Sequence, residues 1–197
     1  MALAPLNAME NYEMHIEGRG GAPDPSFTVP RDRFFLLHNQ GDGTFVEESA
    51  AIGVVVGNLE LGDTGGISET KNPVWLDLEN DGDLDLYVAG SPHFLFENQG
   101  LSDAGAFRGF VDITHSHIVA PTHADKLVFA AAAADFDQDG HLDVVVGRLG
   151  TDLLLRGTPA GFHTPTELPG SGWTTSMAAA DLDGSGSLER AGSVVSG

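Results

Sequence analysis

The sequence predicts an all-β fold made of short antiparallel strands. Its apolar runs are mostly 4–6 residues long, are rich in Val, Leu and Phe, and are bounded by Gly, Asp and Asn, which is typical of strands rather than helices. The 26 Gly and 10 Pro interrupt the 197-residue chain often and favour many short elements. An apolar content of 41% is enough for a folded core.

The apolar runs follow one another in an order of four that occurs three times along the chain. The first run of each unit lies at residues 35–39, 94–98 and 153–157. The second follows a turn and an aromatic residue, at residues 46–48, 111–114 and 163–168. The third run leads into an acidic loop, at residues 74–76, 131–134 and 176–180, and the fourth leaves that loop, at residues 84–89, 142–147 and 188–195.

One of these segments, residues 129–134, is rich in Ala and has a high helix propensity. We nevertheless predict a strand there, because the segment occupies the place that residues 74–76 occupy in the first unit. Its small side chains indicate close packing near an axis on which strands converge.

Units of four short antiparallel strands are typical of the blades of a β-propeller. We predict about three such blades, at about residues 31–90, 91–149 and 150–197, after an extended N-terminal arm at residues 1–30. A closed propeller needs about four to eight blades. The chain is therefore expected to be an incomplete propeller, an open stack, or a protomer that neighbouring copies complete.

Three acidic loops share one nine-residue register, which predicts a repeated site for a hard cation. Oxygen-bearing side chains stand at positions 1, 3, 5 and 9, Gly at position 6 and Leu at position 8. Calcium prefers oxygen ligands, the Gly permits a sharp turn, and position 7 is suited to offer its backbone carbonyl. The predicted ligands are Asp77, Glu79, Asp81, Asp83 and Asp85 in the first loop, Asp135, Asp137, Asp139, His141 and Asp143 in the second, and Asp181, Asp183, Ser185, Ser187 and Glu189 in the third.

The three loops are not expected to bind calcium equally, because ligand charge tunes affinity. The second loop offers four Asp carboxylates, and the first offers four carboxylates of which one, Glu79, is longer. The third offers three carboxylates and the hydroxyl of Ser185. We therefore expect calcium in the first two loops and a weaker site in the third, for which an unligated turn is the alternative. An EF-hand is rejected, because position 12 is Val88, Val146 or Gly192 and the flanking segments read as strands.

The overall charge excludes several kinds of partner. With 29 acidic and 9 basic residues the net charge is −20, so nucleic acid and anionic membrane surfaces are poor partners. Three divalent cations would cancel six of these charges. The sequence has no Cys, so disulfides contribute nothing, and it has no apolar run of the length that crosses a membrane. Residues 1–6 lack the pattern of a signal peptide.

Other residues offer weaker signals. His115, His117 and His123 lie in one insertion and could share a transition metal, but a polar loop explains them more simply. The sequence has no nucleophile-elbow, phosphate-loop or zinc-protease motif. Paired carboxylates would suit glycoside hydrolysis, but cation binding explains them better, and we expect that the protein is not an enzyme.

The acidic loops, together with residues 39–48, resemble FG-GAP/VCBS repeats of integrin-α-type propellers. The stretch Asn39-Gln40-Gly41-Asp42-Gly43-Thr44-Phe45, followed by residues 50–53, is similar to the cartilage-acidic-protein (ASPIC/UnbV-like) branch. The resemblance covers about residues 33–197. It implies a seven-bladed, calcium-stabilised propeller, secreted or on the cell surface, that serves adhesion or scaffolding.

Three functions follow as expectations. The first is an extracellular calcium-binding module with structural ions and an unidentified protein or glycan ligand. The second is a self-assembling subunit of an extracellular filament or shell, whose open edges pair with neighbours or with the remaining blades of a longer chain. The third and least favoured is a lyase or hydrolase that uses the propeller face.

Overall fold

The computed structural model describes residues 34–56, 69–91, 93–118, 128–169 and 172–195, all within one compact unit, Asp32–Gly197. This part of the chain is nearly all β, and its one helix is the single turn α2 (Thr114–His117). The all-β prediction is therefore confirmed. The expected arm at residues 1–30 lies outside the described residues, as do residues 57–68 and 119–127.

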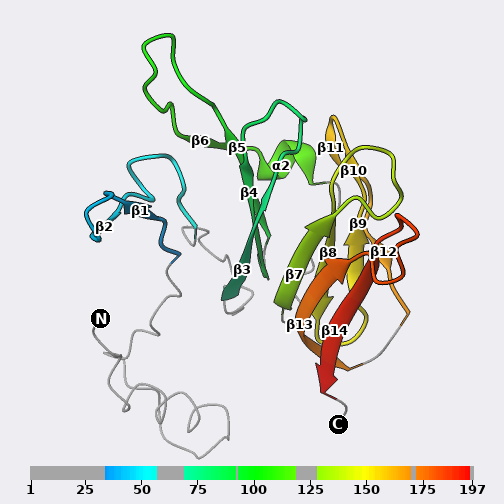
Figure 1. Cartoon of the computed structure of the whole chain (residues 1–197). Helices are drawn as coiled ribbons and strands as arrows, with labels where there is room; N and C mark the ends of the chain where they lie inside the picture. The colour runs from blue at the N-terminus through cyan, green and yellow to red at the C-terminus, as the bar shows by residue number, and fades with distance from the viewer. Residues whose placement is uncertain (1–33, 57–68, 92, 119–127, 170–171, 196–197) are drawn as a thin grey trace, which may run out of the picture. The chain divides into compact units, whose positions relative to one another are not determined.

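Two four-stranded antiparallel sheets form the centre of this unit (Figure 1). In the first sheet, the strands pair in chain order: β3 (Glu69–Leu76), β4 (Asp85–Ser91), β5 (Phe94–Asn98) and β6 (Phe110–Asp112). The second sheet has the same order of pairing: β7 (Val128–Ala134), β8 (Asp143–Arg148), β9 (Leu153–Leu155) and β12 (Thr166–Glu167). Each sheet is a meander of the kind that forms a propeller blade.

Two further pairs of strands are half-sheets. One is β1 (Leu37–Asn39) with β2 (Phe45–Glu47), and the other is β13 (Trp173–Ala180) with β14 (Glu189–Val195). By their place in the repeat, β1 and β2 match the third and fourth strands of a complete sheet, and β13 and β14 match the first and second. A small hairpin, β10 (Gly157–Thr158) with β11 (Gly161–Phe162), completes the strands. No sheet of the described residues is closed on itself.

The sheets and the repeat units of the sequence are out of phase by two strands. The third and fourth runs of the first unit, in β3 and β4, pair with the first and second runs of the next unit, in β5 and β6. A fourfold pattern has no intrinsic starting point, so the short β4–β5 connection, only two residues long, decides which runs share a sheet. The acidic loops consequently join the first and second strands of each sheet.

The apolar runs are continuous because the sheets are covered on both faces. In β4, Leu86 and Val88 pack with Phe94 and Phe96 in one core, whereas the intervening Tyr87 packs in a second core shared with β8 and β9. All five side chains are at most 5% exposed. Alternate residues of one strand therefore hold two neighbouring layers together.

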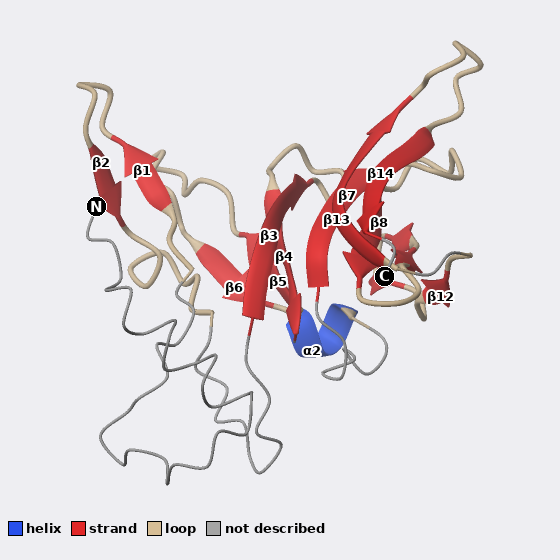
Figure 2. Cartoon of the chain, turned by 90° about the horizontal axis from the view of Figure 1, so that it is seen from below, coloured by secondary structure: helices blue, strands red, loops and turns tan. Residues whose placement is uncertain are grey.

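The Ala-rich run is a strand, as the repeat predicts. The strand that contains it, β7, packs against both β3 and β13, and Figure 2 shows β7 and β13 running side by side. Close approach is also visible at Gly147 of β8, where an added Cβ would lie 2.8 Å from Cγ2 of Thr174. Small side chains thus let the first strands of successive sheets converge.

Candidate metal centre

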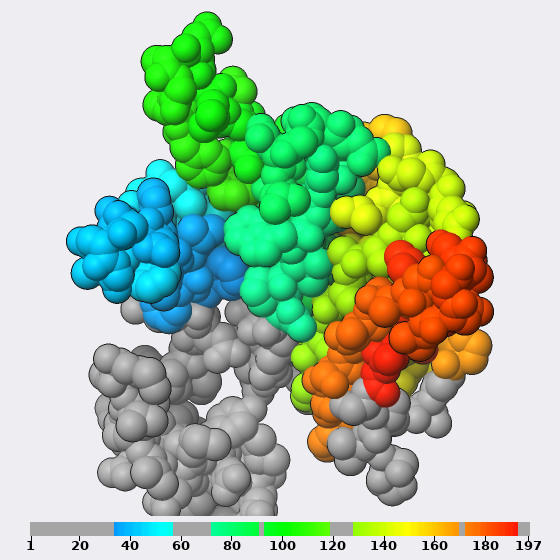
Figure 3. Space-filling view, viewed as in Figure 1, coloured from blue at the N-terminus to red at the C-terminus, as the bar shows by residue number. Residues whose placement is uncertain are grey.

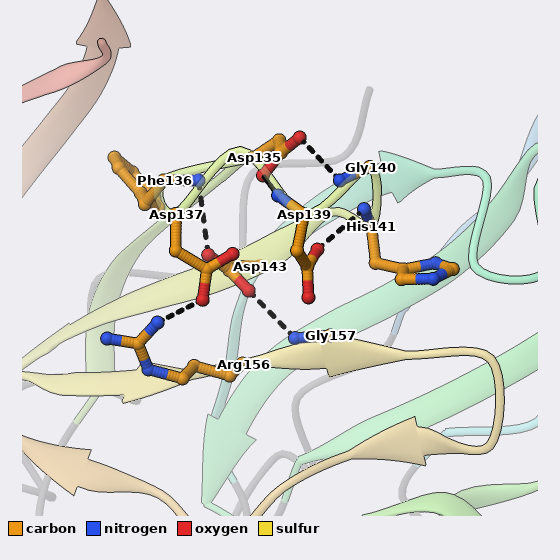
Figure 4. A network of polar contacts seen from close by, with 9 residues as sticks. All are labelled: Asp135, Phe136, Asp137, Asp139, Gly140, His141, Asp143, Arg156 and Gly157. Carbon is orange, nitrogen blue, oxygen red and sulfur yellow. Dashed lines mark hydrogen bonds and ion pairs between the residues drawn. The ribbon is translucent and has the colours of Figure 1, made fainter.

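Each acidic loop is a tight turn between paired strands. The first loop (77–85) joins β3 to β4, the second (135–143) joins β7 to β8, and the third (181–189) joins β13 to β14. Because the flanking strands pair in equivalent registers, positions of the three loops can be compared directly. Figure 4 shows the second loop, with Asp135, Asp137 and Asp143 directed toward a common space.

Two positions in each loop have a left-handed backbone. At position 6 the values of φ are +94°, +90° and +85°, for Gly82, Gly140 and Gly186, as the Gly at that position predicts. Position 4 is also left-handed, with φ of +58° at Asn80, +61° at Gln138 and +73° at Gly184. Asn tolerates this conformation better than most residues, and Gly best. The two reversals curl the loop so that alternate side chains point inward.

The acid at position 1 organises the turn. One oxygen of Asp135 accepts a hydrogen bond from the N–H of Asp139 at 3.1 Å, and the other accepts from Gly140 at 3.0 Å. Asp77 makes the equivalent pair of bonds, and Asp181 accepts from Gly184 and Gly186. The backbone N–H groups therefore hold each of these carboxylates in place before any cation arrives.

Position 5 closes the turn with a second local bond. Asp139 accepts from the N–H of His141 at 2.9 Å, and Asp81 accepts from Asp83 at 2.9 Å. In the third loop the Oγ of Ser185 takes the same role, accepting from Ser187 at 3.1 Å. The Ser is thus a structural equivalent of the Asp, although it brings no charge.

The acid at position 9 lies deepest and links three strands. Asp143 is fully buried, and its two oxygens accept from the N–H of Phe136 at 3.1 Å and of Gly157 at 2.8 Å. Asp85 accepts in the same way from Leu78 and Asn98, both at 2.8 Å. This acid therefore connects its loop to the third strand of the sheet. The core anchor of the first loop is Leu78 at position 2, which is 1% exposed, whereas Leu84 at position 8 is 54% exposed.

Three acids converge in two of the loops. In each set, one oxygen per residue can be chosen so that all three lie within 4.8 Å of one another; the sets are Asp135, Asp137 and Asp143, and Asp181, Asp183 and Glu189. Among the described residues, the acids of the first loop form no such set. The third loop, for which the charge count predicts the weakest site, thus gathers its acids more closely than the first. Either acidic cluster could hold a metal ion.

The first loop differs because Glu79 turns toward Asp85. Burial first, and the nearby Asp85 carboxylate second, raise the pKa of Glu79 to about 7. Burial also raises the pKa of Asp85 and of Asp143, although backbone N–H groups act in the opposite direction. The clustered acids therefore repel one another when all are charged, and a dication would relieve that repulsion.

Arg156 already supplies one positive charge to the second loop. Its guanidinium forms an ion pair with Asp137 (Figure 4), and the equivalent residue in the sheet β3–β6 is Glu97. A cation bound by Asp137 has to share that carboxylate with Arg156 or displace it. Sequence reasoning missed this residue, because an Arg in the fourth place of an apolar run carries no signal until the strand is paired.

We expect Arg156→Ala to strengthen cation binding at the second loop. Loss of a nearby unit charge, screened because the pair is partly exposed, is worth about 1 kcal/mol, close to a fivefold lower Kd for calcium. Calcium titration of the variant by calorimetry measures this. Arg190→Ala is the matched control, since Arg190 pairs with Asp152 outside the loop; equal affinities of the two variants for calcium would contradict the assignment.

The three loops are also connected to one another through position 4. The side-chain amide of Asn80 donates to the carbonyl of Gly140, position 6 of the second loop, at 2.9 Å. Gln138 donates in the same way to the carbonyl of Gly186 in the third loop at 2.8 Å. Gly184 has no side chain, so the series ends there. Hydrogen bonds donated by these side-chain amides therefore hold each loop against the next.

Loss of one of these amides is expected to loosen neighbouring sheets. Gln138→Ala should lower the free energy of unfolding by about 1 kcal/mol, the usual net contribution of one hydrogen bond, and should lower the melting temperature by about 2–4 °C. Thermal unfolding followed by circular dichroism tests this. Gln40→Ala is the control, because the amide of Gln40 donates within its own hairpin, to the carbonyl of His38 at 3.4 Å. An equal loss of stability in the two variants would show that the Gln138 amide does not hold neighbouring sheets together.

The remaining candidates fall outside the clusters. Two of the position-7 side chains face the preceding loop: Nδ1 of His141 is 3.2 Å from Nδ2 of Asn80, and Oγ of Ser187 is 3.3 Å from Nε2 of Gln138. His115 and His117 belong to α2 rather than to an extended segment, so they do not lie on one side of a strand. His123 lies outside the described residues.

The comparison with known protein families agrees with this geometry. Residues 77–146 and 135–190 match the model of the FG-GAP-like repeat, and together they span more than half of the chain. The chain therefore belongs to the FG-GAP-like repeat family. No curated protein matches it. Among the described residues, no helix is both long and apolar enough to cross a membrane.

Proposed function

We propose that the protein is a calcium-binding module of the propeller type, in which the ions stabilise the fold rather than carry out a reaction. The observation that supports this most strongly is the convergence of three acids in equivalent positions of two loops. Calcium takes six to eight oxygens, and each loop offers carboxylates together with backbone carbonyls. Ions in the loops would cross-link the first two strands of a sheet.

The second loop is the strongest candidate in this proposal. It combines the largest number of short carboxylates with a converged set of oxygens. The acids of the third loop converge, but it has one carboxylate fewer than the second. The first loop has four carboxylates, but they do not converge. We propose calcium in all three loops, with the second filled first.

The setting of the module is also proposed. FG-GAP repeats support a propeller-like module, and the similarity of residues 39–53 to the cartilage-acidic-protein branch suggests a secreted or cell-surface protein in adhesion or scaffolding. Its ligand would be a protein or a glycan rather than nucleic acid, because the net charge is −20. No enzymatic role is proposed.

Calcium titration of protein freed of metal by chelation tests the proposal. Calorimetry should show saturable binding of at least two calcium ions per chain, with weaker binding of magnesium, which demands octahedral geometry. The matched variant is Asp137→Asn with Asp183→Asn, which removes one charge from each converged cluster and leaves an amide oxygen in its place. Unchanged binding in this variant, or no saturable binding in the native sequence, would rule the proposal out.

A second candidate function is self-assembly through open sheet edges. It is favoured by the two half-sheets, since an unpaired strand edge exposes backbone N–H and C=O groups that another strand can pair with.

A further inference from the structure

The two half-sheets of this chain are complementary. In the complete sheets β3–β6 and β7–β12, the second strand pairs with a third strand on its far edge. β14 is a second strand, and in the described part of the chain its far edge pairs with nothing. β1 is a third strand, and among the described residues it pairs with β2 alone. The β13–β14 half-sheet therefore lacks a third and a fourth strand, and the β1–β2 half-sheet consists of those two strands.

The β1–β2 hairpin reproduces the geometry of β5–β6. Asn39 pairs with Phe45 as Asn98 pairs with Phe110, and the two preceding pairs of each hairpin keep the same register. The turn chemistry is also the same: Oδ1 of Asn39 accepts from the N–H of Gly41 at 2.9 Å, and Oδ1 of Asn98 accepts from Gly100 at 2.8 Å. The hairpin is thus already shaped as the outer half of a sheet.

The acid at position 9 provides the receiving group on β14. In the complete sheets this acid accepts from an N–H at or just past the end of the third strand, that of Asn98 on Asp85 and that of Gly157, two residues after β9, on Asp143. Glu189 makes the other bond of the set, accepting from Leu182 at 2.9 Å. The residue of β1 at the donor position is Asn39.

Exposure of apolar side chains marks the same two surfaces. Leu37 of β1 is 55% exposed, whereas its equivalents Phe96 and Leu155 are each 1% exposed. On β14, Ala191 is exposed, whereas the equivalent Tyr87 is fully buried. In the space-filling view the β13–β14 hairpin, orange to red, lies at the surface (Figure 3). A third strand seated on β14 would cover these residues.

We propose that β1 of a second copy of this chain pairs antiparallel with β14 and completes its sheet. The register of the complete sheets places Leu37 opposite Arg190 and Leu36 opposite Ala191. In that register the N–H of Asn39 donates to the carboxylate of Glu189, and β2 becomes the fourth strand. The contact is head-to-tail, so each copy uses a different surface at its two joints.

Two copies suffice to close a ring. Each chain holds two complete four-stranded sheets and two half-sheets, so a dimer joined at both ends contains six four-stranded sheets. Six lies within the range of about four to eight blades in closed propellers. The described residues of one chain amount to three four-stranded sheets, which is below that range, so the proposal takes the missing strands from a second copy.

This inference deepens the second candidate function and rests on it, but it does not depend on bound calcium. The joint consists of backbone hydrogen bonds, apolar burial and one hydrogen bond to the Glu189 carboxylate, and such a carboxylate accepts from the third strand in the complete sheets. The experiment is therefore run both in calcium and in chelator, so that cross-linking and calcium titration can fail separately.

Cysteine cross-linking tests the register. The sequence contains no Cys, so Leu37→Cys and Arg190→Cys are prepared as separate single variants and mixed under mild oxidation. Directly opposite residues have Cβ atoms about 4.5–5.5 Å apart, which small strand movements bring within disulfide reach. The expected main product is a mixed disulfide dimer. Val111→Cys replaces Leu37→Cys in the control, since Val111 is similarly exposed, at 48%, on a complete sheet.

The mass of the unmodified protein gives a second readout. Sedimentation should show a dimer with twice the 20.6 kDa mass of the chain. A monomer at every concentration tested, or a mixed cross-link no more abundant than in the Val111→Cys control, would overturn the proposal. The double variant Leu37→Cys with Arg190→Cys should give disulfides between chains; a disulfide within one chain would overturn it as well.

Discussion

We expect chelation of divalent cations to lower the melting temperature of this protein by about 10–20 °C. A site held at about 100 times its Kd stabilises the fold by about 2.7 kcal/mol, so two filled loops contribute about 5 kcal/mol. A domain of this size loses about 2–4 °C for each kcal/mol. The loss is large because the acids of the second and third loops converge and repel one another once the cation has left. Differential scanning calorimetry with and without EGTA measures it.

A charge-reduced variant separates calcium binding from a general salt effect. Asp137→Asn with Asp183→Asn keeps an oxygen at each position and removes one charge from each converged cluster. Its melting temperature should respond to EGTA much less than that of the native sequence. An unchanged melting temperature in chelator, with magnesium held constant in both samples, would contradict structural calcium in these loops.

The second large effect is expected at Asp143, and it does not require calcium. Asp143→Ala removes the acceptor of the Phe136 and Gly157 N–H groups in a buried setting. An unsatisfied buried donor costs about 1–3 kcal/mol, so the two together should lower the free energy of unfolding by about 2–6 kcal/mol. Urea denaturation in chelator measures the difference.

Asp139→Ala is the matched control in the same loop. Asp139 is exposed and accepts only from His141, so its loss in chelator should lower the free energy of unfolding by less than about 1 kcal/mol. In calcium both variants should lose further stability, because Asp139 and Asp143 are both predicted ligands of the second loop, so the two effects are compared in chelator. Equal losses for the two variants in chelator would show that Asp143 does not hold the strands together.

The fold class could be predicted because its signals are local. Short apolar runs between Gly and Asp predict strands, and the place of residues 129–134 in the repeat identified a strand despite its helix propensity. The phase of the sheets could not be predicted in the same way. Which runs share a sheet depends on the short β4–β5 connection and on Asp85, whose carboxylate bonds the β5 end at Asn98, and neither has a sequence signature.

The residues of the site could be predicted from the sequence, but the distances between their oxygens could not. The nine-residue register identifies every acid of the loops, and the left-handed Gly at position 6 follows from its type. Convergence depends on side-chain direction, which differs between Glu79, turned toward Asp85, and Asp137, paired with Arg156. The amides of Asn80 and Gln138 reach loops of other sheets, so they become visible only once the sheets are stacked.

Diffraction from crystals grown in calcium tests the central claim most directly. We predict an anomalous peak in the second loop, roughly 2.3–2.6 Å from oxygens of Asp135, Asp137 and Asp143, with Arg156 withdrawn from Asp137 or sharing it. A calcium-replete crystal whose second loop holds only water, with Arg156 still paired to Asp137, would contradict the account.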